Sequence, residues 1–140
     1  MSFREKTAWV MIVILTGAGL WYFKMIYIAS SAMDAVAPII PAFLVGYVLL
    51  IIIASIILMS MIAVASPEEA DAPADEREKL LQDKAGNWSG YILGFGVIAG
   101  ILHYSVNADG NLLAQLCFAS LMLSQIAEYG FQIWFYRRGV

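Results

Sequence analysis

The stretch that decides the fold is residues 42–65, AFLVGYVLLIIIASIILMSMIAVA. It contains no charged residue and is dominated by Ile, Leu, Val and Met. About 20 apolar residues in an α-helix cross the ~30 Å hydrocarbon core of a bilayer. Because lipid offers the backbone no hydrogen-bond partner, a helix, which pairs its own polar groups, is the expected structure. Residues 42–65 therefore predict a membrane-spanning helix that faces lipid more than its neighbours do.

Three further apolar runs lie at about residues 8–30, 88–106 and 112–136. The chain of 140 residues is 61% hydrophobic and only 14% charged, which is more apolar surface than a soluble domain can keep dispersed. We expect an all-α fold, with residues 1–140 forming a single transmembrane domain. Short connections force neighbouring helices to run antiparallel, so the simplest packing is an integral membrane four-helix up-down bundle.

The positions of Lys and Arg predict the orientation in the membrane, because cytoplasmic loops carry an excess of them. Basic residues precede the first run, lie within the polar stretch 66–87 and follow the fourth run, whereas the two short connections near 33–41 and 107–111 have none. Both termini and the loop 66–87 are therefore expected in the cytoplasm. The helical pattern from Asp75 onward predicts that the end of this loop continues into the third span.

Residues 75–102, DEREKLLQDKAGNWSGYILGFGVIAGIL, resemble the most recognisable segment of a family of small bacterial four-span membrane proteins. In that family the pattern seen here as Asp75, Glu76 and Arg77, in an acidic loop before the third span, is the signature. The resemblance implies a multi-pass protein of the bacterial inner (cytoplasmic) membrane. Some members are encoded beside small helix-turn-helix regulators, which implies signalling or regulation. The family has no established activity to carry over.

The polar stretch 66–87 has two interpretations. It is either a solvated helix start with ordinary charge pairs or a docking surface for a cytoplasmic regulator. In the second interpretation Asp75, Glu76 and Arg77 supply charge, and Leu80 and Leu81 supply apolar contacts. The excess of acidic residues argues against nucleic acid as a partner.

Glycines in the third run recur at helical spacing. Gly86, Gly90 and Gly94 are four residues apart, and Gly96 and Gly100 form a second series with the same spacing. Small residues at this spacing let two helix backbones approach closely in lipid. The two series predict two faces, one for packing within the chain and one for a second copy of the chain. The alternative is that both faces pack inside the bundle.

Five polar residues within the predicted spans are candidates for function: Lys24, His103, Gln125, Glu128 and Gln132. Charged groups are costly in lipid, so the helical period is expected to turn them toward the bundle interior, with the two glutamines hydrogen-bonding the glutamate. Such a cluster predicts a polar pocket or a proton-linked path. The alternatives are structural: Lys24 extends to the headgroups, while His103 and Glu128 only hold helices together.

The chain has one His and one Cys, so a Cys/His metal site from a single chain is not expected, and no catalytic arrangement or cofactor motif stands out. We therefore expect a non-enzymatic interaction or accessory protein that binds another membrane protein, a second copy of itself or a cytoplasmic regulator. The alternative is a small oligomeric proton-linked transporter or channel that uses Glu128.

Overall fold

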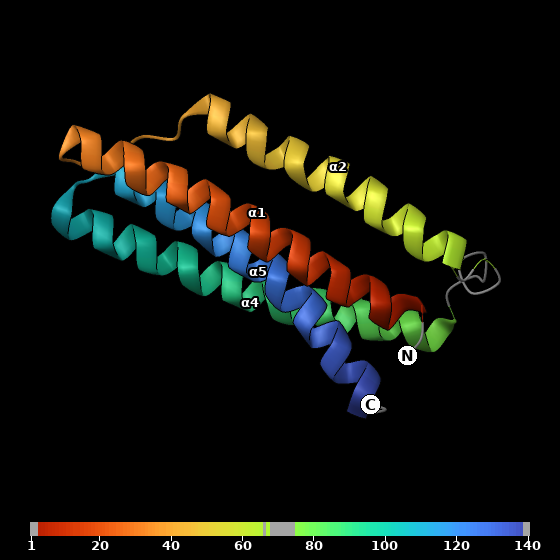
Figure 1. Cartoon of the computed structure of the whole chain (residues 1–140). Helices are drawn as coiled ribbons and strands as arrows, with labels where there is room; N and C mark the ends of the chain where they lie inside the picture. Colours follow the sequence, from red (N-terminus) through yellow and green to blue (C-terminus); the bar gives the residue numbers. More distant parts are fainter. Residues whose placement is uncertain (1–2, 66, 68–74, 139–140) are drawn as a thin grey trace.

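The computed structural model describes residues 3–65, 67 and 75–138. Its four helices are α1 (Phe3–Met33), α2 (Pro41–Ala65), α4 (Glu76–Asn107) and α5 (Gly110–Arg138) (Figure 1). Each helix is long and apolar enough to cross a membrane, and each contains one of the predicted runs. The expected all-α class is therefore confirmed. Most of the predicted loop before Asp75, namely residues 66 and 68–74, lies outside the described residues.

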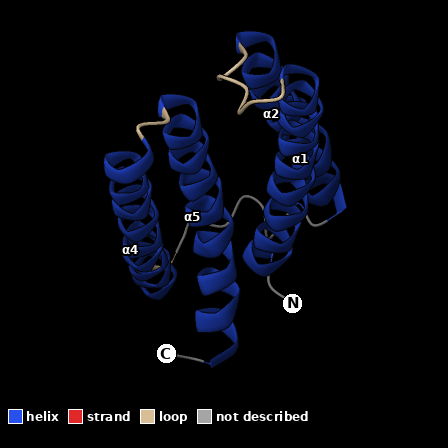
Figure 2. Ribbon diagram, turned by 90° about the vertical axis from the view of Figure 1, so that its left-hand side faces the viewer, coloured by secondary structure: helices blue, strands red, loops and turns tan. Residues whose placement is uncertain are grey.

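The helices pack in the order α4, α5, α1, α2 rather than as a closed ring. Helix α5 lies between α4 and α1, and α2 packs on α1. Viewed along the molecule, α4 and α2 lie on opposite sides (Figure 2). Successive helices are antiparallel, as expected, but within the described residues α2 and α4 make no contact comparable to the other three pairs.

Helix α2 explains why the bundle stays open. Tyr47 is its one buried residue among those described. A helix that is hydrophobic on every side has no face that favours protein over lipid. The prediction that residues 42–65 form the most exposed of the four helices is confirmed, because no residue of its most apolar window is buried.

Two ion pairs join three helix ends at one end of the molecule, which we call the charged end. Arg4 Nε lies 2.6 Å from Glu78 Oε2, which joins the starts of α1 and α4. Arg137 Nε lies 2.9 Å from Glu5 Oε1, which joins the end of α5 to the start of α1. Both short connections lie at the opposite end (Figure 1). This is the arrangement that the expected topology requires.

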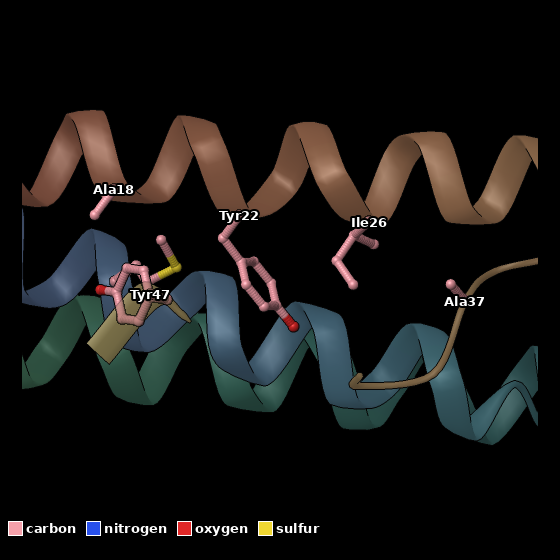
Figure 3. Close-up of a cluster of buried hydrophobic side chains, with 6 residues drawn as sticks. Ala18, Tyr22, Ile26, Ala37 and Tyr47 are labelled. Atoms are coloured by element: carbon pink, nitrogen blue, oxygen red, sulfur yellow. The ribbon is translucent and has the colours of Figure 1, made fainter. Parts of the chain in front are cut away.

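The larger core cluster joins α1, α2 and α5 at the level of Tyr22. This ring lies 4.6 Å from that of Phe118 and 6.1 Å from that of Tyr47, measured between centroids. Such tilted and edge-on ring pairs are favourable beyond the area that they bury. The buried residues of the cluster, drawn in Figure 3, are Ala18, Tyr22, Ile26, Ala37, Tyr47 and Met122.

The connection between α4 and α5 is a tight turn, as the sequence predicts. Ala108 adopts a left-handed backbone conformation with φ of 53°, and its N–H donates to Tyr104 O at 2.7 Å. Asp109 Oδ1 then accepts the backbone N–H of Leu112 at 3.0 Å, which satisfies one of the free donors at the start of α5. The turn therefore places α4 and α5 side by side and antiparallel.

Candidate functional site

The most extensive packing in the molecule is between α4 and α5, and small residues allow the two helices to approach closely. A Cβ atom at Gly96 would overlap the side chain of Ser120. A Cβ atom at Gly100 would lie 3.4 Å from Leu113 and 3.5 Å from Leu116. The Gly96–Gly100 series therefore packs within the chain. We call this contact between α4 and α5 the seam.

Polar groups meet along the same seam nearer the charged end. Ser124 Oγ donates to the backbone O of Ser89 at 2.9 Å. One turn further along, the carboxylate of Glu128 lies opposite Gly86, with Oε1 3.9 Å from the position that a Cβ there would occupy. Glu128 is half-buried. The missing side chain at Gly86 gives the carboxylate room between the two helices.

Two of the three glycines in the other series point away from the seam, whereas Gly86 lies in it, so the expectation that these three share one face is wrong for Gly86. A Cβ atom at Gly90 or Gly94 would meet nothing within 4 Å, and both residues are exposed. Ile98 and Ile101 continue the same side of the helix and are 60% and 53% exposed. We call Gly90, Gly94, Ile98 and Ile101 the outer glycine face. It is unpartnered within the described residues.

Three of the five polar residues in the predicted spans do not face the interior of the bundle. Lys24, His103 and Gln125 are exposed, so the expectation that all five line the bundle core is wrong for these three. The buried stripe of α1 runs through Ala18 and Tyr22, and Lys24, two residues further along, lies on nearly the opposite side of the helix.

The exposure of the other two residues also has a local cause in each case. Gln125 follows Ser124, which occupies the seam, and is therefore turned about 100° away from α4. His103 lies near the end of α4, where its ring nitrogen is 3.1 Å from the side-chain amide of Asn107 rather than against α5.

The remaining two polar residues are buried or half-buried, but no hydrogen bond connects them. Gln132 is 8% exposed, whereas Glu128 is half-buried. Within the described residues, the carboxylate of Glu128 has no hydrogen bond with Gln125 or Gln132, so the expected amide partners do not form. The five residues are thus spread over three helices rather than gathered into one polar pocket.

Sequence reasoning missed the buried polar centre of the fold. Tyr22 Oη donates to Gln115 Oε1 at 3.2 Å, and Gln115 Nε2 donates to the backbone O of Ala37 at 3.2 Å. The Ala37 N–H in turn donates to Ser30 Oγ at 2.9 Å. This chain of bonds ties the connection between α1 and α2 to α5. The available signal was Gln115 itself, a polar side chain within a predicted span.

The D-E-R residues lie at the start of α4. Asp75 precedes the helix, and its backbone N–H donates to Glu78 Oε2 at 3.3 Å, while Glu76 and Arg77 are exposed. Acidic side chains here also interact favourably with the positive end of the helix dipole. The prediction that a helix starting near Asp75 runs into the third span is confirmed.

The predicted leucine docking pair is corrected by the structure. Leu80 is 68% exposed, but Leu81 is only 5% exposed and packs with Ala85 and Phe135. Two consecutive residues on a helix point about 100° apart, so one of them faces α5 while the other faces outward. Leu81 is part of the core, and only Leu80 is available to a partner.

An open apolar hollow lies beside the seam near the charged end. Its volume is about 380 Å³, and its lining consists of Trp88, Ala127, Gly130, Phe131 and Trp134. Arg138 lies over the Trp134 ring, 4.7 Å from its centroid. Lys84 lies over the neighbouring Phe135 ring at 4.9 Å. We call this feature the aromatic hollow.

The fold defines the class of the protein: the residues that the structure describes form four helices, each long and apolar enough to cross a membrane. Comparisons with family models, curated proteins and solved structures found no match. The likeness to four-span proteins with a D-E-R loop therefore stays an expectation from the sequence. Within the described residues, no group of three or more His, Cys, Asp or Glu side chains could hold a metal ion.

Proposed function

We propose that the chain is a small multi-pass interaction protein of the bacterial inner membrane, with both termini in the cytoplasm. It acts by binding a helix of another membrane protein, or of a second copy of itself, through the outer glycine face. The observation that carries this proposal is the contrast between two pairs of glycines on α4. Gly96 and Gly100 are covered by α5, whereas Gly90 and Gly94 have nothing within 4 Å.

The seam illustrates what the outer glycine face offers. Where α5 covers Gly96, the two helices approach closely enough for side chains of one to touch the backbone of the other. In lipid there is little hydrophobic gain from bringing helices together, so association depends on such close packing and on polar contacts. A face with two glycines four residues apart supports the same kind of contact with a helix from outside the chain.

The test compares full-length variants in gentle detergent or lipid nanodiscs. Gly90→Leu combined with Gly94→Leu should release a co-purifying partner or reduce the particle to one copy, as measured by mass spectrometry and light scattering. The matched control is Gly17→Leu, because Gly17 is also an exposed helix glycine with nothing within 4 Å. If the double variant keeps the same particle mass and the same partners as the native chain, the proposal fails.

The chain also has a surface that a cytoplasmic regulator can bind. The first turns of α4 present Glu76, Arg77 and Leu80, all exposed, beyond the expected membrane boundary. Leu80→Asp should release such a regulator in a pull-down without disturbing the fold. An unchanged pull-down from Leu80→Asp would remove this surface from the proposal.

The alternative function is a proton-linked transporter that uses Glu128. It is favoured by the half-buried carboxylate in the seam, which faces Gly86. The exposure of Gln125 weighs against it, because the expected polar path along α5 is not continuous. In proteoliposomes, Glu128→Gln should abolish coupled flux while leaving the fold intact. A flux that persists in this variant would exclude the carboxylate as the proton carrier.

A further inference from the structure

The aromatic hollow is formed by a change in side-chain size along α5. Trp134 and Phe131 project beside two small residues, Ala127 and Gly130, and Trp88 of α4 closes the other side. A Cβ atom at Gly130 would meet nothing within 4 Å, so the space is open at that position. The lining contains no charged side chain. It therefore suits an apolar chain better than a polar solute.

The hollow lies where lipid headgroups are expected to begin. From Ala127 to Trp134 it runs roughly 10 Å along α5, at ~1.5 Å per residue. Trp residues favour the boundary between hydrocarbon and headgroups, and Trp88 and Trp134 both line the hollow. Arg138 lies over the lining residue Trp134, and Lys84 lies over Phe135, whose ring centroid is 5.8 Å from that of Trp88. An occupant would therefore have an apolar part beside Ala127 and a polar part near the cations.

The two cations beside the hollow differ from those that close the helix ends. Arg4 and Arg137 pair with Glu78 and Glu5. In the part of the chain that the structure describes, Arg138 and Lys84 contact aromatic rings but form no salt bridge with a carboxylate. Their N–H groups can therefore donate to an anionic oxygen, and Arg and Lys carry several donors each.

The acidic residue nearest the hollow along α5 faces elsewhere. Glu128 follows Ala127 directly, but its carboxylate lies in the seam opposite Gly86. It is not part of the lining. At the headgroup end, α5 therefore contributes the positive charge of Arg138, and α4 contributes Lys84 beside the exposed Asp83.

We propose that the aromatic hollow binds one acyl chain of an anionic phospholipid, whose phosphate is held by Arg138 and Lys84. The chain lies against Trp88, Phe131 and Trp134, with its path opened by Gly130. Basic groups beside a space between membrane helices on the cytoplasmic side are typical of sites for anionic headgroups. This site shares the membrane location with the proposed function but does not involve the outer glycine face, so either proposal can fail without the other.

The first test measures which lipids stay with the purified full-length chain. The protein is extracted from vesicles with equal amounts of phosphatidylglycerol and phosphatidylcholine, and the retained lipids are quantified by native mass spectrometry. Each basic residue near the surface favours anionic lipid by about fivefold, so two cations predict a retained ratio of roughly tenfold to thirtyfold in favour of phosphatidylglycerol. Retention at the bulk ratio would overturn the proposal.

Two variants separate the parts of the site. Gly130→Leu fills the hollow and should reduce the retained lipid, while Arg138→Gln combined with Lys84→Gln should return the ratio of retained lipids to near the bulk value. The controls are Gly17→Leu and Lys24→Gln, an exposed glycine and an exposed cation outside the site. If only the cation variant has an effect, the phosphate contact is superficial and the acyl-chain site is wrong.

A second measurement uses the native chain, so it does not depend on a variant folding. Trp88 and Trp134 line the hollow, and their fluorescence is quenched by bromine atoms on a bound acyl chain. At low mole fraction, brominated phosphatidylglycerol should quench more strongly than brominated phosphatidylcholine. Equal quenching by the two lipids would contradict a selective site.

Discussion

A methyl group added at residue 96 tests whether α4 and α5 pack as closely as the seam requires. In Gly96→Ala, the new Cβ would overlap Ser120 Oγ and lie 2.6 Å from Ser120 Cβ. Carbon atoms in ordinary contact are about 3.5–4.0 Å apart, so the helices must separate by roughly 1 Å. Ser120 Oγ can rotate away, but Ser120 Cβ is fixed to the backbone of α5, so the remaining shift falls on the backbone.

The magnitude follows from three contributions. Overpacking of a close contact costs about 1–3 kcal/mol. Separation of the helices also stretches the 2.9 Å bond from Ser124 to Ser89, and a bond of this kind contributes about 0.6 kcal/mol in a membrane protein. Replacing Gly by Ala inside a helix stabilises the folded state by roughly 0.5–1 kcal/mol. We therefore expect Gly96→Ala to lower the free energy of unfolding by about 1–3 kcal/mol.

The assay is reversible unfolding in mixed micelles with increasing SDS, followed by circular dichroism. Gly90→Ala is the matched control and should be neutral or up to about 1 kcal/mol stabilising, because nothing lies within 4 Å of a Cβ there. Adding Ser120→Gly to Gly96→Ala should recover most of the loss. Equal effects at residues 90 and 96, or no recovery with Ser120→Gly, would refute the close packing of the seam.

Three further predictions concern the core and the charged end. Tyr22→Phe should lower the free energy of unfolding by about 1 kcal/mol, and Gln115→Met should lower it further, because it also removes the bond to Ala37 O. The double variant should cost clearly less than the sum, because both changes break the same 3.2 Å bond; strict additivity in the double-mutant cycle would contradict that bond. Leu81→Ala should lower the free energy of unfolding by about 2–5 kcal/mol in the same assay, whereas Leu80→Ala should change it by no more than about 0.5 kcal/mol. Similar costs at the two positions would contradict their different burial. Arg4→Gln should lower the free energy of unfolding by at most about 1 kcal/mol, because the ion pair of Arg4 with Glu78 is partly exposed. This cost should shrink in high salt, and a cost that does not respond to salt would argue against an electrostatic origin.

Hydrophobic composition was enough to predict the four helices, because the physics of a span depends on length and polarity alone. Residues 42–65 identified α2 and also its exposed position, since a uniformly apolar helix has no preferred face. The glycine spacing predicted two different faces on α4. It did not say which glycines would be covered, because that depends on where α5 lies.

The placement of the polar residues could not be predicted in the same way. The helical period gives the angle between Gln125 and Gln132 on α5, but it does not give the direction of the neighbouring helices. The seam follows Ser120 and Ser124, so Gln125 is left outside although Gln132 is buried. The polar centre at Gln115 depends on a backbone carbonyl in the connection between α1 and α2, which no periodicity in the sequence reveals.

The middle position of α5 has a consequence for biosynthesis. Helices emerge from the ribosome in chain order, and α1, α2 and α4 are all synthesised before the helix that α4 and α1 both pack against. Until α5 is made, α4 has no extensive contact with the two earlier helices, so the nascent chain consists of two parts that share little beyond the ion pair of Arg4 with Glu78. The final helix joins them, and a chain cut short before Gly110 would leave α4 without its partner.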